Sequence, residues 1–324
     1  MHRIADLDPA RYQRHAIHGG DRIWAETNCY TDVLIELLHG LGCEPRAALA
    51  FTLGIDFEGD EWTFFKFRDA DLERLYGWQI EELAPWRALD EHVEEQLRQG
   101  RPVLVELDSF YLPDTQGTAY RMAHVKSTVA VNLLDREARR MGYFHNQGYH
   151  ELGGEDFSAL FQPLHEVHER MLPPYIEFVK RRRQPLFGTA LRDASLDLLR
   201  AQLQRLPECN PFVSFGQRFA SDLDWLLPSD IDRFHTYSFV TWRQFGACFE
   251  LAATYLDWLA TVGVAGLHGA ANELRQISQT SKAFQFQLAR AMTRKRRPEL
   301  DVIEHMAQGW ARAMDVLRCE LCGA

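Results

Sequence analysis

The sequence lacks several features that would place it in a class at once. Its 324 residues contain no window of 18 uncharged apolar residues, which argues against a membrane-spanning helix. The first residues lack the apolar stretch of a secretory signal peptide, so we expect a cytoplasmic protein. A net charge of −10 argues against a general nucleic-acid-binding protein.

Motifs of several enzyme classes are missing as well. The chain has no glycine-rich phosphate-binding loop and no Gly-x-Ser-x-Gly nucleophile elbow. Its six cysteines do not indicate a disulfide framework, because cysteines inside a cell are mostly reduced. Cys319 and Cys322 have the gap of a zinc knuckle but lack a second cysteine or histidine pair. We therefore predict no metal site.

What is present suits a globular protein of two domains. Hydrophobic residues make up 46% of the chain and charged residues 25%, so core material is ample. A helix followed by strand patterns predicts an α+β domain over residues 1–168. Residues 169–324 carry helical periodicity, and strand signals vanish from Pro173 onward, which predicts an all-α domain.

The expected elements follow from periodicity and from helix and turn signals. A first helix is predicted over residues 29–41, with Thr27 or Asn28 as its N-cap. Strands are predicted over residues 48–53, 62–67, 79–83, 102–108, 124–131 and 140–145. Further helices are predicted over residues 69–76, 88–99, 189–205, 211–225, 240–260, 266–292 and 299–318.

The order of three residue types indicates a cysteine-nucleophile enzyme. Cys29 begins the first helix, where unpaired N–H groups and the helix dipole favour a thiolate. His124 opens a predicted strand and could act as the base. Asn146, after the next strand, could orient that imidazole, with His145 as the alternative.

Structural explanations exist for the same residues. A free cysteine is often a small buried hydrophobe, and a lone strand histidine is often a satisfied core residue. The aromatic loop after the 102–108 strand could be a simple turn or the wall of a site. Under the second interpretation the substrate-binding candidates are Asn28, Asp108, Tyr111, Asp114 and Lys126.

Four stretches resemble a known family. Asn28-Cys29-Tyr30, residues 108–113, His124-Val125 and residues 143–146 resemble the N-terminal domain of butirosin biosynthesis protein H. This resemblance covers about the first 165 residues. The whole chain more closely resembles an uncharacterised bacterial family encoded beside amino acid:carrier-protein ligases.

The resemblance implies a papain-like acyltransferase. Cys29 would take an acyl or aminoacyl group from a carrier-protein phosphopantetheine thioester, and a small amine would accept it. The protein would need no cofactor of its own, since the carrier protein brings the phosphopantetheine. His124 would shuttle the proton, and Asn146 would orient the His124 ring. Related enzymes often have Asp at the orienting position.

Two other functions are compatible with the same residues and fold. A cysteine hydrolase (amidase, peptidase or thioesterase) would need only water as the acceptor. A non-catalytic carrier-protein-binding protein would keep the fold without the chemistry. Two basic runs, residues 180–183 and 294–297, are solvated surface or a docking patch for an acidic partner.

Overall fold

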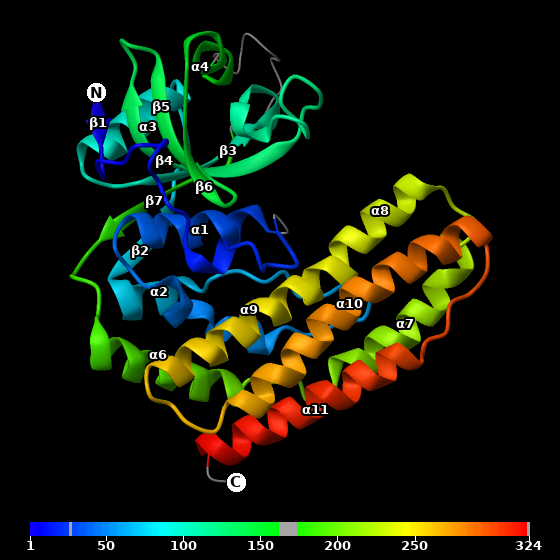
Figure 1. Ribbon diagram of the computed structural model, residues 1–324. Helices are drawn as coiled ribbons and strands as arrows, with labels where there is room; N and C mark the ends of the chain where they lie inside the picture. Colours follow the sequence, from blue (N-terminus) through cyan, green and yellow to red (C-terminus); the bar gives the residue numbers. More distant parts are fainter. Residues whose placement is uncertain (26–27, 162–173, 323–324) are drawn as a thin grey trace. The chain divides into compact units, whose positions relative to one another are not determined.

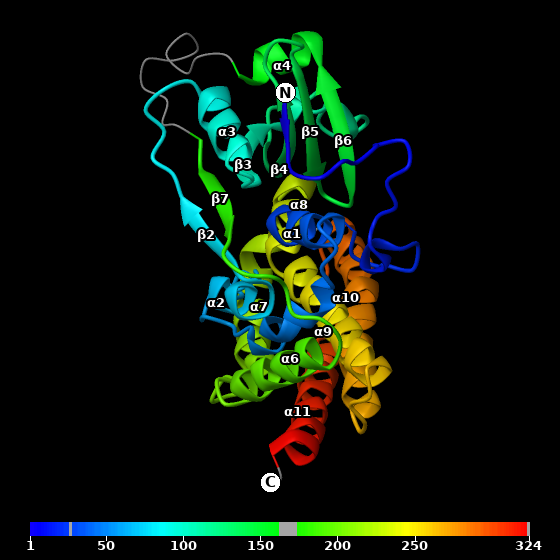
Figure 2. The ribbon, with the colours of Figure 1, turned by 90° about the vertical axis from the view of Figure 1, so that its left-hand side faces the viewer.

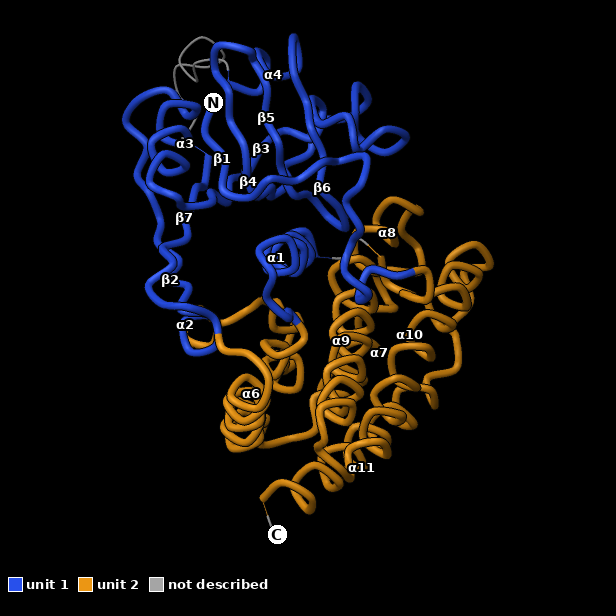
Figure 3. Tube along the Cα trace, turned by 60° about the vertical axis from the view of Figure 1, so that its left-hand side comes forward, with its two compact units in different colours: residues 1–19, 28–45, 72–185 blue, residues 20–27, 46–71, 186–324 orange. Residues whose placement is uncertain are grey.

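The computed structural model describes residues 1–25, 28–161 and 174–322. The chain divides into two compact units, coloured separately in Figure 3. Unit 1 comprises residues 1–19, 28–45 and 72–185, and unit 2 comprises residues 20–27, 46–71 and 186–324. None of the described helices is long and apolar enough to cross a membrane.

Unit 1 is built on a seven-stranded sheet in which all paired strands are antiparallel. Its order is β2-β7-β3-β4-β5-β6, and the short β1 pairs with β4 (Figure 1). The strands are β1 (His2–Arg3), β2 (Trp78–Glu82), β3 (Val103–Asp108), β4 (Lys126–Asp135), β5 (Arg140–His145), β6 (Gly148–Gly153) and β7 (Ile176–Arg181). Figure 2 shows β2 and β7 side by side.

Helices cover both faces of this sheet. The helices associated with unit 1 are α1 (Cys29–Gly40), α2 (Asp69–Tyr76), α3 (Leu89–Arg98) and α4 (Gly154–Leu160). Side chains alternate along β4 and β5, so Val129 and Tyr143 pack with α3 and α4 in one apolar core. Phe144 points to the other face, where it contacts Gly40 of α1. We call these two surfaces the α3–α4 face and the α1 face.

Unit 2 is helical in the part of the chain that the structure describes. Its elements are the 3-10 segment Pro45–Gly54 and the helices α6 (Gly188–Leu203), α7 (Pro211–Leu226), α8 (Ile231–Val240), α9 (Trp242–Thr261), α10 (His268–Arg294) and α11 (Asp301–Cys322). Aromatic rings fill its core, with Trp242, Phe215 and Phe245 buried in mutual contact. Trp24 is also fully buried here and donates to the Ser278 hydroxyl.

The predicted α+β domain followed by an all-helical one is confirmed. Three local predictions are wrong. Residues 48–53 lie in a 3-10 segment, residues 62–67 contribute only the isolated bridge at Trp62, and residues 176–181 form β7. A short buried apolar run has no period that separates strand from helix, which explains the first two errors. The predicted boundary at residues 168/169 lies outside the described residues.

Close packing of α9 against Trp24 yields a stability prediction. A Cβ at Gly246 would lie 2.5 Å from the Trp24 ring, too close for a rigid buried indole to accommodate. Gly246→Ala should therefore destabilise the protein by about 1–3 kcal/mol, although alanine favours helices. At Gly269 the nearest atom would be 4.0 Å away, so Gly269→Ala should be neutral or stabilising. Thermal unfolding of both variants checks this, and equal melting temperatures would contradict it.

Candidate active site

Cys29 is the first residue of α1, as its flanking residues predict. Asn28 is the N-cap, and its side-chain oxygen accepts from the Thr31 N–H at 3.0 Å. The other predicted cap, Thr27, lies outside the described residues. The Cys29 thiol is half-buried and donates to the Thr128 hydroxyl on β4 at 3.8 Å. The thiol thus lies on the α1 face of the sheet.

The remaining cysteines differ from Cys29 in burial and position. Burial raises the pKa of Cys43 to about 11, despite the nearby Arg181 guanidinium, and raises that of Cys248 as well. Both thiols stay protonated at neutral pH and are poor nucleophiles. Cys209, Cys319 and Cys322 are exposed. Among the described residues, no group of three or more histidine, cysteine or acidic side chains could hold a metal ion.

His124 is held by a carboxylate that the sequence suggested only as a substrate contact. Its Nδ1 lies 2.6 Å from Asp108 Oδ2, while Asp108 Oδ1 accepts from the Phe110 N–H at 3.0 Å. The imidazole stacks on the Phe110 ring at 4.3 Å, with Tyr111 at its edge. The ring is 67% exposed. An ionised Asp108 makes Nδ1 the donor, which leaves Nε2 as the basic nitrogen.

Strand register places this pair on the same face as Cys29. Asp108 is opposite Lys126, and Glu106 is opposite Thr128, in the β3–β4 ladder. All four side chains therefore project from the α1 face. Lys126 is mostly exposed and forms an ion pair with Glu106 at 2.7 Å. In the part of the chain described here, the thiol bonds to Thr128 and the imidazole to Asp108, and no hydrogen bond joins Cys29 to His124.

The two predicted orienting residues lie elsewhere. Asn146 has φ of +48° in the two-residue turn between β5 and β6, a left-handed conformation that asparagine tolerates. His145 is opposite Val129 and points to the α3–α4 face, away from the thiol. Asp114 lies on that same face, bonded to His145. The structure thus brings Asp108 to His124, and Asp114 to His145.

Sequence reasoning missed one member of this second cluster. Ser127 Oγ lies 2.6 Å from His145 Nε2, and His145 Nδ1 lies 2.6 Å from Asp114 Oδ2. The Tyr143 hydroxyl donates to Asp114 Oδ1 at 2.5 Å. Alternation along β4 and β5 would place Ser127 and His145 on one face, but only the register brings them together.

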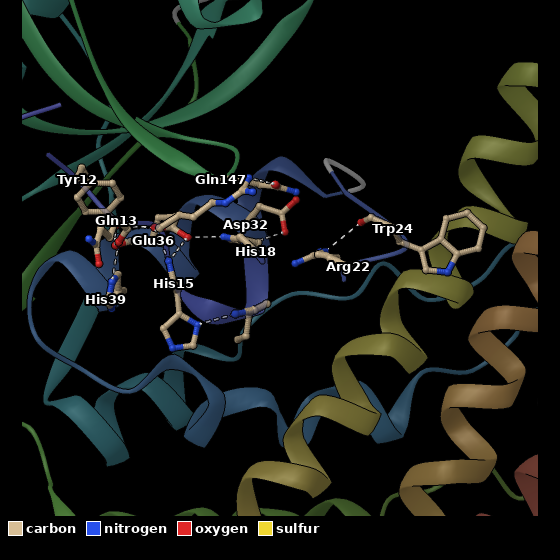
Figure 4. A network of polar contacts seen from close by, with 12 residues as sticks. Tyr12, Gln13, His15, His18, Arg22, Trp24, Asp32, Glu36, His39 and Gln147 are labelled. Atoms are coloured by element: carbon tan, nitrogen blue, oxygen red, sulfur yellow. Dashed lines mark hydrogen bonds and ion pairs between the residues drawn. The ribbon is translucent and has the colours of Figure 1, made fainter. Parts of the chain in front are cut away.

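A buried charged network fixes α1 to the chain that precedes it (Figure 4). The Glu36 carboxylate accepts from the Tyr12 hydroxyl at 2.5 Å and from the His15 N–H at 3.1 Å. It also contacts His18 Nδ1, whose Nε2 faces Asp32 at 3.2 Å. The side chains of His18, Asp32 and Glu36 are fully buried. Their bonds hold α1, and hence Cys29, in a fixed position within unit 1.

An open pocket of about 730 Å³ lies along the β6 edge of unit 1. Tyr12, Arg14, Asp114, Gln147 and His150 are among its lining residues. Arg14 donates to the Gln147 side chain at 3.2 Å. Charged residues of both signs line this pocket, Arg14 and Asp114 among them.

Comparison with protein families agrees with this two-part architecture. A model of the DUF1839 N-terminal domain matches residues 13–181, and one of the DUF1839 C-terminal domain matches residues 188–319. The chain belongs to the DUF1839 family. The first match ends with the last residue of β7, and the second begins with the first residue of α6. The family is uncharacterised, and no curated protein matches the chain.

Proposed function

We propose that this DUF1839 protein is a cytoplasmic acyl- or aminoacyltransferase of papain-like layout. Cys29 is the nucleophile, His124 the base, and Asp108 the residue that orients the base. The proposal rests on one observation: a carboxylate-held imidazole lies on the same sheet face as a thiol at a helix N-terminus. Nucleophilic cysteine catalysis needs this set of groups.

The proposed reaction has two steps. His124 Nε2 takes the thiol proton, Cys29 sulfur bonds to the acyl carbon, and the donor C–S bond breaks. The phosphopantetheine thiol leaves with the proton. An amine then attacks the acyl-cysteine, forms an amide and releases the thiol. The first step exchanges one thioester for another and is nearly isoenergetic, whereas the second is downhill.

The donor and acceptor classes come from the resemblance to butirosin biosynthesis protein H. In that enzyme an acyl group moves from a carrier-protein thioester to an aminoglycoside amine. Related enzymes often orient the histidine with Asp, and Asp108 fits that role better than Asn146. The basic run at residues 180–183 adds little support for carrier docking. Lys180 faces Glu81 and Arg183 bonds to the Glu73 carbonyl, so both are engaged within unit 1.

Intact-mass measurement tests the proposal. The protein is incubated with aminoacyl thioesters of N-acetylcysteamine, which copy the end of phosphopantetheine. We expect a mass increase that maps to Cys29 and is absent in Cys29→Ser. Cys209→Ser removes an exposed cysteine outside the site and should label like the wild type. No adduct, or one spread equally over the exposed cysteines, would contradict the assignment.

Addition of amines separates transfer from hydrolysis. An amide product that depends on the amine supports the transferase, while free acid alone indicates a cysteine hydrolase.

One observation favours a non-catalytic carrier-binding protein as the second candidate. The thiol's hydrogen-bond partner is Thr128, a hydroxyl that cannot act as a base at neutral pH. Binding of a charged carrier protein without any acyl transfer to Cys29 would favour that function.

A further inference from the structure

A serine, a histidine and an aspartate form a hydrogen-bonded series on the α3–α4 face, opposite Cys29. Ser127 Oγ lies 2.6 Å from His145 Nε2, and His145 Nδ1 lies 2.6 Å from Asp114 Oδ2. Both distances are those of strong hydrogen bonds. The same three residue types in this order form the triads of serine hydrolases. The series shares no residue with the Cys29 site.

The surroundings of Asp114 keep it in the form that can orient a histidine. Burial opposes ionisation of Asp114, but the hydrogen bond and charge of His145 outweigh it and lower the pKa of that carboxyl. An ionised Asp114 only accepts, so Nδ1 of His145 carries a proton. In the neutral ring Nε2 then accepts from the Ser127 hydroxyl, and this tautomer can remove the serine proton.

Ser127 is less buried than His145 and Asp114, as a nucleophile that must meet a substrate requires. Asp114 is 6% exposed and His145 1% exposed, so water competes little for their bond. Ser127 is half-buried and is the most accessible of the three. The Tyr143 hydroxyl holds the second oxygen of Asp114 and fixes the carboxylate.

We propose that Ser127, with His145 as base and Asp114 as orienter, is a second nucleophile that cleaves esters of apolar acids. Val125, two positions before Ser127, is 51% exposed, and its carbonyl accepts from the Ser109 N–H in continuation of the β3–β4 ladder. By the alternation of an extended chain it lies on the Ser127 side. This apolar side chain favours an apolar acyl group.

The reaction balances without a cofactor. Ser127 Oγ bonds to the acyl carbon and its proton passes to His145 Nε2. The ester C–O bond breaks, and the alcohol leaves with that proton. Water, activated by the same nitrogen, then releases the acid and restores the serine.

A fluorophosphonate probe, which labels activated serines, tests this inference. We expect one adduct on the wild-type protein, mapping to Ser127, and hydrolysis of p-nitrophenyl butyrate. Ser127→Ala should abolish both, and Asp114→Asn should slow both by about 10⁴-fold. This labelling and the aminoacyl adduct on Cys29 involve different reagents and different residues, so failure here is distinct from failure of the Cys29 proposal.

Ser158→Ala supplies the matched control, because Ser158 is a polar helix serine of α4 whose hydroxyl donates to a backbone carbonyl. It should label like the wild type. Folded wild-type protein that takes up no probe overturns the inference. An adduct that persists in Ser127→Ala would also overturn the inference.

Discussion

Replacing His124 with glutamine should slow acylation of Cys29 by about 10²- to 10⁴-fold, the range that general acid–base catalysis contributes. Glutamine keeps much of the size and polarity of the side chain but cannot carry a proton from the thiol to the leaving group. The exposed position of the ring leaves room for the variant to fold normally. The rate is measured as growth of acyl-enzyme mass in a single turnover with an aminoacyl thioester.

Two further variants serve as comparisons for His124→Gln. Asp108→Asn keeps the shape at the imidazole but removes the charge that stabilises its protonated form, so we expect a smaller loss than for His124. His305→Gln alters an exposed histidine of α11 and should leave the rate unchanged. Wild-type acylation rates in His124→Gln would remove His124 from the mechanism, whatever the role of Cys29.

Replacing Glu36 with alanine should cost about 3–5 kcal/mol of the free energy of unfolding, as breaking a buried ionic network generally does. Three donors, the Tyr12 hydroxyl, the His15 N–H and the His18 ring, would lose their common acceptor inside the core. Urea denaturation measures the loss. Glu95→Ala, which removes an exposed pair with Arg98 on α3, should change stability by no more than about 0.5 kcal/mol. Similar losses in both variants would contradict a special role for Glu36.

The same carboxylate predicts the response to acid. Burial raises the pKa of Glu36, but hydrogen bonds from His18 and Tyr12 and the charge of His18 outweigh it, so the pKa lies below its ordinary 4.5. A lowered folded-state pKa contributes stability above the unfolded value, and that stability is lost as pH falls below it. Wild-type stability should therefore decline below about pH 4.5 more steeply than that of Glu36→Gln. Parallel acid curves for the two proteins would refute this.

Local signals were enough for much of the fold. The apolar stripe after Cys29 and the capping side chain of Asn28 predict α1 to within one residue at its end. The buried run before Asp108 predicts β3 because it is short, apolar and rich in valine. β7 escaped prediction because it follows a double proline and ends in basic residues. Its place in the sheet depends on pairing with β2 and β3, which are far away in sequence.

The candidate site was predictable in its residue types but not in its pairings. Cys29, His124 and Asp108 could each be named as polar groups at element ends. That Asp108 bonds to His124 follows from Asp108 lying opposite Lys126, and register is not written in local sequence. A change of register by one residue would instead have moved the serine and histidine of the second series to the α1 face.

The discontinuity of unit 2 has a consequence for synthesis on the ribosome. Trp24 is fully buried by contacts with α9 and α10, including its bond to Ser278, which follows 254 residues later. At translation rates of 5–20 residues per second, Ser278 is synthesised roughly 13–50 s after Trp24. Ile23, Trp24 and the apolar side chains of residues 46–71 therefore leave the exit tunnel before the helices that bury them. Trp24 is therefore among the last of the early residues to reach its native surroundings.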